Sequence, residues 1–445
     1  MNNDISKQFY NYLWAYILVA LSGCLGNVVD GIIVGNLTSE DGVSAINLSK
    51  PVNQLIFTLH LLINAGAGML VGYAIGQGDF VRARGLFTSA LTFSTSIGVV
   101  LAVMGGILLP DETTHLLCNN QQILPLARDY LQVLLLGNPA FILMWGLSTM
   151  VGVNGQPKLV SIAVIIDNTV NLLLDIVFIK YFDWGIAGSS IATVVGHLIG
   201  ISILSLHWLK PEHRRLKFVW RESNFHILPI ITKIVSQGAP LAIASICLTL
   251  LLLFANTTVL STMGRTGIFA FAVCMNLLQV YNLFISGTCQ TLQSLGTIQV
   301  GKGDADNLHL VIRKGFCFIT IAMIVTCIFV WIDPQFVAIL FGATTPEMIT
   351  ETDKALRIFT ISFIPFSYIY VLMIVYKLYS QHHMALFISF TLSLAVIPIL
   401  WIMAQVAPEM LWFSYLVAYL VEIMLIAMLH KITRSKFSLM TKSPL

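Results

Sequence analysis

Long apolar blocks follow one another along the whole sequence, and they constrain the fold more than any other feature. A helix needs about 20 apolar residues to cross a hydrocarbon core of about 30 Å. Twelve blocks reach this length: 11–36, 46–75, 86–109, 125–150, 159–180, 186–208, 228–262, 268–300, 311–332, 353–379, 382–405 and 409–430. Because only 10% of the residues are charged and 57% are hydrophobic, a water-soluble domain is excluded.

The uninterrupted character of these blocks indicates helices. In lipid, every backbone amide and carbonyl group must find its hydrogen bond within the protein, and only helices and closed barrels achieve this. We therefore predict an all-α polytopic membrane protein with twelve transmembrane helices.

Lysines and arginines are distributed unevenly between the two ends of the predicted helices. Six of the 24 fall toward the side opposite the N-terminus: Lys50, Arg128, Lys180, Arg265, Lys354 and Arg357. The other 18 lie on the side of the N-terminus, and cytoplasmic loops are the ones that carry such an excess. We therefore expect a multi-pass protein of the cell (inner) membrane with both termini in the cytoplasm. The basic segment 209–227 is then an orientation signal rather than a site for nucleic acid.

The chain contains an internal repeat. Residues 42–79 and 267–304 align without a gap at an offset of 225 residues, and both end in the pattern Gly-x-Gly-Asp. Because six is an even number, two six-helix lobes insert with the same orientation and are related by a pseudo-two-fold axis along the membrane normal. The predicted parts are an N-terminal lobe (1–208), a basic cytoplasmic linker (209–227), a C-terminal lobe (228–430) and a cytoplasmic tail (431–445).

Five polar residues of the first lobe are predicted to share one layer of the membrane. Asp30, Asn53, Asp175 and Thr193 lie about 8–10 Å from the outer ends of their helices, and Asn171 lies one turn below Asp175 on the same face. A charge at the middle of a helix costs about 2.5–3.5 kcal/mol on insertion scales. Two carboxylates with amide and hydroxyl oxygens can bind Na⁺ or share a proton. A static polar network between helices is the alternative, and the spacing leaves both open.

Further polar residues inside the predicted helices are candidates for cavity lining or for relaying protons. They are Asn53, His60, Asp167, His197 and Glu422. Asp167 continues the stripe of Asn171 and Asp175 at intervals of four residues, and histidine titrates near neutral pH. A hydrogen-bonded packing role is the alternative for both histidines. At the offset of 225, His197 aligns with Glu422.

The second lobe contributes amides and hydroxyls more than charges. One face of a predicted helix carries Asn276, Gln279, Ser286 and Gln290, and we expect this face to form a wall of the cleft in which transporters of this design bind substrate. The counterpart of Asp30 is Ala255, so the acidic site is confined to the first lobe.

Several segments resemble one known family. The stretches "NVVDGIIVGN", "VNGQPKLV", "NLLLDIVFI" and "WGIAGSSIAT" are similar to the signatures of the multidrug and toxic-compound extrusion (MATE) transporters. The resemblance covers the whole chain, and residues 152–193 are its most specific part. It implies the branch of bacterial and archaeal members with a cation site in the N-terminal lobe. That site, for H⁺ or Na⁺, would comprise Asp30, Asn171, Asp175 and Thr193.

The resemblance implies a secondary-active antiporter that exports organic compounds, cationic or amphipathic, in exchange for H⁺ or Na⁺. We expect a monomer embedded in membrane lipid, with a small-molecule substrate, no nucleic-acid partner, no enzymatic activity and no cofactor besides the coupling ion. A flippase for lipid-linked precursors is the nearest alternative. It would need a basic cavity, and Lys50 is the one lysine or arginine that the sequence puts clearly inside a helix. A membrane-embedded enzyme is the third reading.

Overall fold

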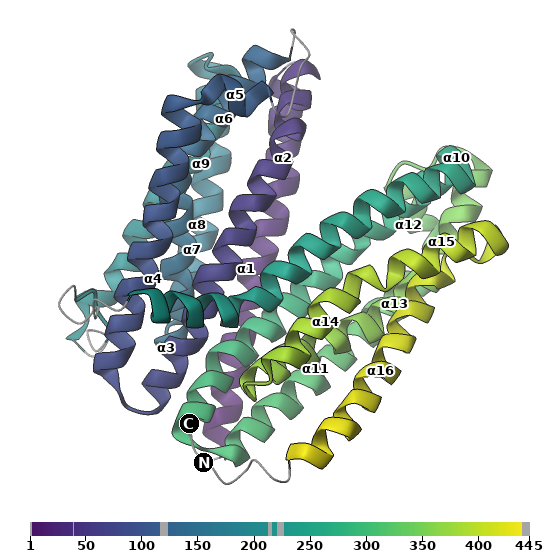
Figure 1. The fold of residues 1–445 in the computed structure, drawn as a ribbon. Helices are drawn as coiled ribbons and strands as arrows, with labels where there is room; N and C mark the ends of the chain where they lie inside the picture. The colour runs from purple at the N-terminus through teal and green to yellow at the C-terminus, as the bar shows by residue number, and fades with distance from the viewer. Residues whose placement is uncertain (1, 39, 116–122, 212–215, 220–226, 438–445) are drawn as a thin grey trace. The chain divides into compact units, whose positions relative to one another are not determined.

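The structure is a computed structural model that describes the chain except residues 1, 39, 116–122, 212–215, 220–226 and 438–445. Every regular element of the described chain is helical (Figure 1). The helices form two compact units. The first unit comprises residues 1–242 and 290–312, and the second unit comprises residues 243–289 and 313–445. The predicted linker 209–227 and tail 431–445 lie partly outside the described residues, and the four-part division stays a prediction.

The first unit begins with a helix that is almost uninterrupted from the N-terminus to its outer end. Its elements are α1 (Asn2–Leu37), α2 (Glu40–His60), the π-helical turn η1 (Leu61–Ala65), α3 (Gly66–Gly76), α4 (Phe80–Leu101), η2 (Ala102–Leu108), α5 (Pro110–His115), α6 (Leu124–Leu136), α7 (Asn138–Val153), α8 (Pro157–Ile176), η3 (Val177–Tyr181), α9 (Gly185–Ser205) and η4 (Leu206–Leu209). The turn η1 joins α2 to α3 in one span, and α6 bends by 46° into α7.

The second unit contains most of a very long helical segment and the helices that follow it. Its elements are α10 (Ile227–Lys302), whose two ends belong to the first unit, α11 (Ala305–Ile332), whose start also belongs to the first unit, α12 (Pro334–Leu340), α13 (Pro346–Leu378), α14 (His382–Leu394), α15 (Val396–Val406), η7 (Pro408–Met410) and α16 (Phe413–Phe437). Gly264 interrupts α10 with a φ of 63°, which is not a helical value.

The predicted membrane spans coincide with these helices. Within the described chain, ten helices are long and apolar enough to cross a membrane, and the bent pair of α6 and α7 adds an eleventh span. The apolar stretch of α10 is 74 residues long and is broken at Gly264, so it supplies two spans and brings the number to the predicted twelve. The helix count that the apolar blocks predict is therefore consistent with the structure.

The two copies of the repeat end in the same local structure. Gly78 and Gly303 occupy equivalent positions and have φ values of 76° and 68°, a conformation that glycine adopts without strain. The following residues, Asp79 and Asp304, each accept a hydrogen bond of 3.0 Å from the backbone amide three residues later. This is the usual N-cap of a helix, so each Gly-x-Gly-Asp pattern turns the chain and starts the next helix.

Close packing explains why the end of α10 belongs to the first unit. Glycines at 76 and 301 allow α3 and the end of α10 to touch through their backbones, because a Cβ atom on either residue would clash with the other helix. Two side-chain hydrogen bonds support this contact. Gln293 donates to the carbonyl of Ala65 at 3.1 Å, and Ser294 lies 2.8 Å from the hydroxyl of Tyr16.

Candidate functional site

Two acidic side chains meet inside the first unit. Asp30 extends from α1 and Asp175 from α8, and α1 and α8 pack along one another. The two carboxyl groups are close enough to interact directly. The side chain of Asp175 is 0% exposed, and that of Asp30 is half-buried. The structure thus brings together the two acids that the sequence analysis put at one depth.

These two acids are poorly supplied with hydrogen-bond donors. In the described chain, no hydrogen bond of ordinary geometry reaches either carboxyl oxygen of Asp175 or Oδ1 of Asp30, although the side chain of Ser189 lies beside Asp175. A buried carboxylate normally has a cation or several donors beside it, and two carboxylates in contact repel one another when both are ionised. The arrangement therefore favours uptake of one positive charge between the two groups.

Asn171 and Thr193 lie beside the acids but bind each other. The amide nitrogen of Asn171 donates to the hydroxyl of Thr193 at 3.1 Å, and this hydroxyl donates to the backbone carbonyl of Ser189 at 3.1 Å. The side chain of Ser189 itself lies next to Asp175. Asn171 and Thr193 are thus joined through the amide nitrogen of Asn171 and the hydroxyl of Thr193, and their part in cation coupling stays a prediction.

The predicted fifth member, Asn53, reaches the acids through a residue that the sequence analysis missed. Tyr130 on α6 is buried, and its side chain interacts with Asn53 and electrostatically with both Asp30 and Asp175. A tyrosine near the end of a membrane helix is common, so the residue type alone did not mark Tyr130 as part of the site. Only the neighbourhood of α2 and α6 in space reveals its position.

Asp167 and His197 form a buried pair. The Nδ1 atom of His197 lies 3.1 Å and 3.0 Å from the two carboxyl oxygens of Asp167. The side chains are 5% and 12% exposed for Asp167 and His197, respectively. A Cβ atom at Gly196 would lie 2.6 Å from Oδ1 of Asp167, so a glycine at this position makes room for the carboxyl group.

Two further candidates have partners within their own units. His60 is buried, its Nδ1 atom accepts a hydrogen bond of 3.1 Å from the amide nitrogen of Asn64, and it packs against the ring of Trp145, which fits the packing role left open above. Glu422 in the second unit is 1% exposed and accepts a hydrogen bond of 2.7 Å from Thr391. Its other carboxyl oxygen has no partner among the described residues.

The predicted wall of the substrate cleft lies along α10. Asn276 and Gln279 are exposed, and Ser286 is half-buried, all within the second unit. Gln290 is half-buried in the first unit. Because the amide of Asn276 also donates to its own helix at 2.9 Å, these residues are compatible with a polar surface, and their role in a cleft stays a prediction.

Lys50 and Lys377 bear on the prediction about basic residues inside the helices. Lys50 is exposed on α2, and no ion pair joins it to Asp30 in the described chain. The statement that Lys50 is the one basic residue clearly within a helix is wrong, because Lys377 lies within α13 and is fully buried. Lys377 lies two residues before the end of the predicted block 353–379, so it looked like part of the cytoplasmic boundary.

Whether the acidic site can hold Na⁺ depends on how many oxygen ligands it offers. Proteins surround hard cations with about six or more oxygen ligands. The acid pair offers three carboxyl oxygens that lack donors among the described residues, whereas Asn171 and Thr193 are engaged with one another. In the described chain, no group of three or more acidic, histidine or cysteine side chains is arranged to hold a metal ion. These oxygens can hold a proton or contribute to a Na⁺ site, so the coupling ion stays a prediction.

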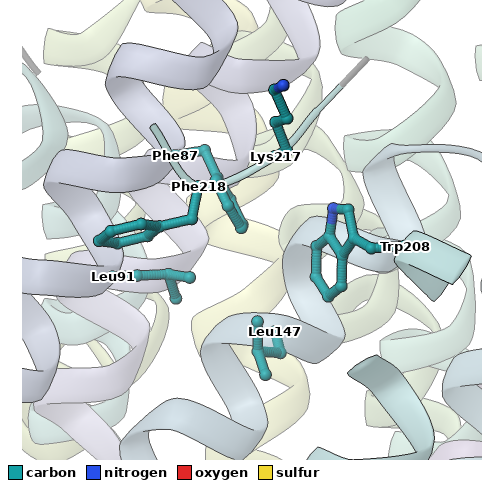
Figure 2. A pocket seen from close by; sticks show the side chains of 6 residues that line it. All are labelled: Phe87, Leu91, Leu147, Trp208, Lys217 and Phe218. Carbon is teal, nitrogen blue, oxygen red and sulfur yellow. The ribbon is translucent and has the colours of Figure 1, made fainter. Parts of the chain in front are cut away.

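A separate apolar pocket of about 430 Å³ lies in the first unit (Figure 2). It is lined by Phe87, Leu91, Leu147, Trp208, Lys217 and Phe218. The described part of the linker closes it: Leu216 is fully buried and accepts a hydrogen bond from the indole of Trp208, and the amide of Val219 donates to Thr88 at 3.0 Å. None of the predicted site residues lines this pocket.

Comparison with known proteins identifies relatives. The family model MatE matches residues 16–177 and 240–402, one segment for each copy of the repeat. The multidrug export protein MepA of Staphylococcus saprophyticus is 24% identical over 275 residues, which cover 60% of this chain and 59% of the relative. MepA of Staphylococcus aureus is 24% identical over 280 residues, which cover 62% and 61%. The chain thus matches about three fifths of the length of these relatives.

Solved structures have the same fold. An aspartate-to-asparagine mutant of the Vibrio cholerae MATE transporter VcmN superposes with a TM-score of 0.88 at 18% identity, covering 98% of both chains. A MOP superfamily transporter from Pyrococcus furiosus, described as having a binding pocket of reverse polarity, superposes with a TM-score of 0.87 at 17% identity, covering 97% of this chain and 96% of its own. The predicted two-lobe helical membrane fold is therefore confirmed. Since the family model matches well over half of the chain, the protein belongs to the MatE family.

Proposed function

We propose that this protein is a secondary-active efflux antiporter that exports organic, cationic or amphipathic compounds in exchange for protons. Export of several compounds is supported by the MepA relatives, which are multidrug export proteins. The cationic or amphipathic character of the substrate follows from the family resemblance. The observation that carries the coupling mechanism is the contact between the buried carboxyl groups of Asp30 and Asp175. The protein acts in the cell membrane as a monomer with both termini in the cytoplasm, and it transports rather than catalyses.

The energetics of the acid pair support one exchangeable proton. A single charge at this depth costs about 2.5–3.5 kcal/mol, and a second charge in contact adds repulsion. One shared proton reduces the pair to a single charge, and a second proton or a cationic substrate nearby removes it. A proton and a positively charged compound therefore compete for the same negative charge, which is the requirement for exchange.

The helix α1 is the element through which protonation can change the conformation. Cβ atoms built at Gly23 and Gly31 meet nothing within 4 Å, so these glycines are not required for close packing. Glycines in a helix reduce its stiffness. Neutralisation of Asp30 removes its repulsion of Asp175, so this part of α1 can move relative to α8, and a bend near these glycines accommodates the movement.

The test uses purified protein in proteoliposomes loaded with a fluorescent organic cation. An imposed pH gradient should drive export, and a Na⁺ gradient of equal size at constant pH should drive little. Asp175→Asn should abolish the gradient-driven export, whereas Asp111→Asn, which removes one member of an exposed ion pair with Arg128, should preserve it. Export that is unchanged in Asp175→Asn, or driven by Na⁺ alone, would contradict the proposal.

A flippase for lipid-linked precursors is the second candidate, and the buried Lys377 is the observation that favours it. A pyrophosphate-containing cargo needs basic side chains within the membrane. Vesicles that contain a fluorescent lipid with a pyrophosphate headgroup distinguish the two functions. Protein-dependent loss of headgroup protection from an external quencher would favour the flippase, and its absence together with export of the cation would favour the antiporter.

A further inference from the structure

We propose that Asp167 and His197 form a relay station that exchanges protons with the Asp30–Asp175 pair. The inference rests on the proposed function and extends it, because it assigns a route to the coupling proton. It is motivated by the arrangement of polar side chains between α8 and α9, the two helices that pack most closely along this part of the first unit.

Three polar contacts follow one another between α8 and α9, and each of them is called a rung below. They are Asp175 with Ser189, Asn171 with Thr193, and Asp167 with His197. Each step moves four residues down α8 and four residues up α9, as expected for antiparallel helices in register. At 1.5 Å per residue the three rungs span about 12 Å. The acid pair is thereby connected to the middle of α8 by side chains that all carry hydrogen-bonding groups.

The second contact, between Asn171 and Thr193, can connect the other two. The hydroxyl of Thr193 accepts a hydrogen bond from Asn171 and donates one to the carbonyl of Ser189. Because its proton points to a carbonyl and the bond it accepts comes from an amide, this hydroxyl can connect the other two contacts only through its remaining lone pair, which can order a bridging water molecule. The amide of Asn171 holds this hydroxyl between the two acidic rungs.

The third contact, between Asp167 and His197, can receive and hold a proton. When His197 is neutral, its Nδ1–H donates to the Asp167 carboxylate, and the free Nε2 can take up a proton. The proton leaves the acid pair, which gains one negative charge, and arrives at His197, which becomes an imidazolium paired with the Asp167 carboxylate. Because the pair is almost completely buried, the carboxylate stabilises the imidazolium with little screening by water.

The elements packed against α8 and α9 carry titratable side chains of their own. Among them are Cys24 and Asp30 on α1, His60 on α2, Tyr130 on α6, and the exposed Lys180 and Tyr181 on η3. The helix α7 contributes the ring of Phe141, whose centroid lies 5.5 Å from that of His197, and has no titratable side chain.

Toward the start of α8 from the Asp167–His197 pair, the bundle is apolar. Ala163 and Val164, one turn further toward the start of α8, belong to a buried cluster with Met144 and Leu204. A proton at the station is therefore separated from the cytoplasmic end by apolar packing in this conformation. Such a seal allows the proton to leave only when the bundle rearranges, which prevents an uncoupled leak.

The decisive variant is His197→Gln, which keeps a hydrogen bond to Asp167 but cannot carry a proton. Export driven by a pH gradient is measured in proteoliposomes between about pH 5.5 and 8.5, the range in which histidine titrates. We expect the rate to fall about tenfold or more, because positioned proton transfer contributes at least this much, and the pH profile to become flat. Equilibrium binding of the organic cation should not change. A wild-type rate and pH profile would overturn the proposal.

Controls separate the relay from a structural role. His207→Gln changes another buried histidine of the first unit, one that is bonded to Asn154 at 2.7 Å, and should keep the wild-type rate. The swapped variant Asp167→His/His197→Asp restores an acid–imidazole pair and should recover most of the export that His197→Gln loses. If His197→Gln does not fold, the swapped variant is compared with Asp167→Asn/His197→Gln, and equal rates would contradict the relay.

The relay and the proposed function fail in different ways. If the wild-type protein shows no export driven by the pH gradient, the antiporter proposal itself is wrong. If the wild-type protein exports, Asp175→Asn does not, and His197→Gln behaves as the wild type does, the antiporter stands and the relay is wrong.

Discussion

The two units bury acidic side chains in different ways. In the first unit, Asp30 and Asp175 face one another, and three of their oxygens lack a donor from the described residues. In the second unit, Glu422 is bonded to the hydroxyl of Thr391. The position that corresponds to Asp30 is Ala255, which is fully buried. The repeat has thus kept its turns and helix caps in both copies, whereas the opposed acids occur in the first.

This difference separates an acid that can exchange a proton from one that stabilises helix packing. A lone protonated carboxyl group can be accommodated by one hydroxyl partner, because it carries no charge. Two opposed carboxyl groups have no arrangement without a bound proton or cation that avoids repulsion. We therefore expect substitutions of the acids in the two units to have unequal effects on transport.

The largest effect is expected for Asp175→Asn. The variant removes one of the two carboxyl groups and with it the shared proton, so export driven by a pH gradient should fall by a factor of about 100 or more. The measurement is the initial rate of efflux of a fluorescent cation from proteoliposomes. A residual rate close to the wild-type value would remove the distinction between the two units.

Ala255→Asp recreates in the second unit the acid that the repeat lacks there. The new carboxyl group would be buried without the partners that the first unit supplies, and its insertion should cost about 2.5–3.5 kcal/mol. Thermal unfolding in detergent micelles should show a clear loss of stability, while Ala255→Ser, a small polar change, should show much less. A variant as stable as the wild type would mean that this position already has polar surroundings.

Tyr130→Phe tests the supporting residue of the acid pair. The change removes the hydroxyl that interacts with Asn53 and the two acids but keeps the ring and its packing. Loss of one hydrogen-bonding group beside a charge corresponds to about 1.5–3 kcal/mol, so export should slow by about tenfold or more. Expression and thermal stability should stay near the wild-type level. An unchanged rate would show that the phenol group is only a neighbour.

The smallest effect is expected for Glu422→Gln. The amide oxygen of the glutamine can accept the same hydrogen bond from Thr391, and the side chain keeps its size. Export should stay within about twofold of the wild type. A loss comparable to that of Asp175→Asn would place a second coupling acid in the second unit and would break the comparison on which this account is built.

The sequence predicted what depends on distance along a helix. The rise per residue put Asp30, Asp175 and Thr193 at one depth, and the spacing of four residues put Asp167, Asn171 and Asp175 on one face. The family resemblance selected four members of the same group. These quantities are fixed within single helices, so they do not require knowledge of how helices pack.

What the sequence could not predict depends on which helices are neighbours and on how each is rotated. Tyr130 and Ser189 have common residue types and became visible as partners of the acids only through the packing of α6 and α9. Asp167 and His197 were both identified, but their pairing required the register between α8 and α9. Lys377 was missed because the end of a helix is poorly defined in an apolar sequence.

The central claim is that Asp30 and Asp175 hold a proton that substrate displaces. The most direct test is the release of protons when an organic cation is added to the purified protein in weakly buffered detergent solution near neutral pH. Because linked binding is reciprocal, the wild type should release about one proton for each bound cation, and Asp175→Asn should bind without release. Binding by the wild type without proton release, or equal release by the variant, would contradict the account.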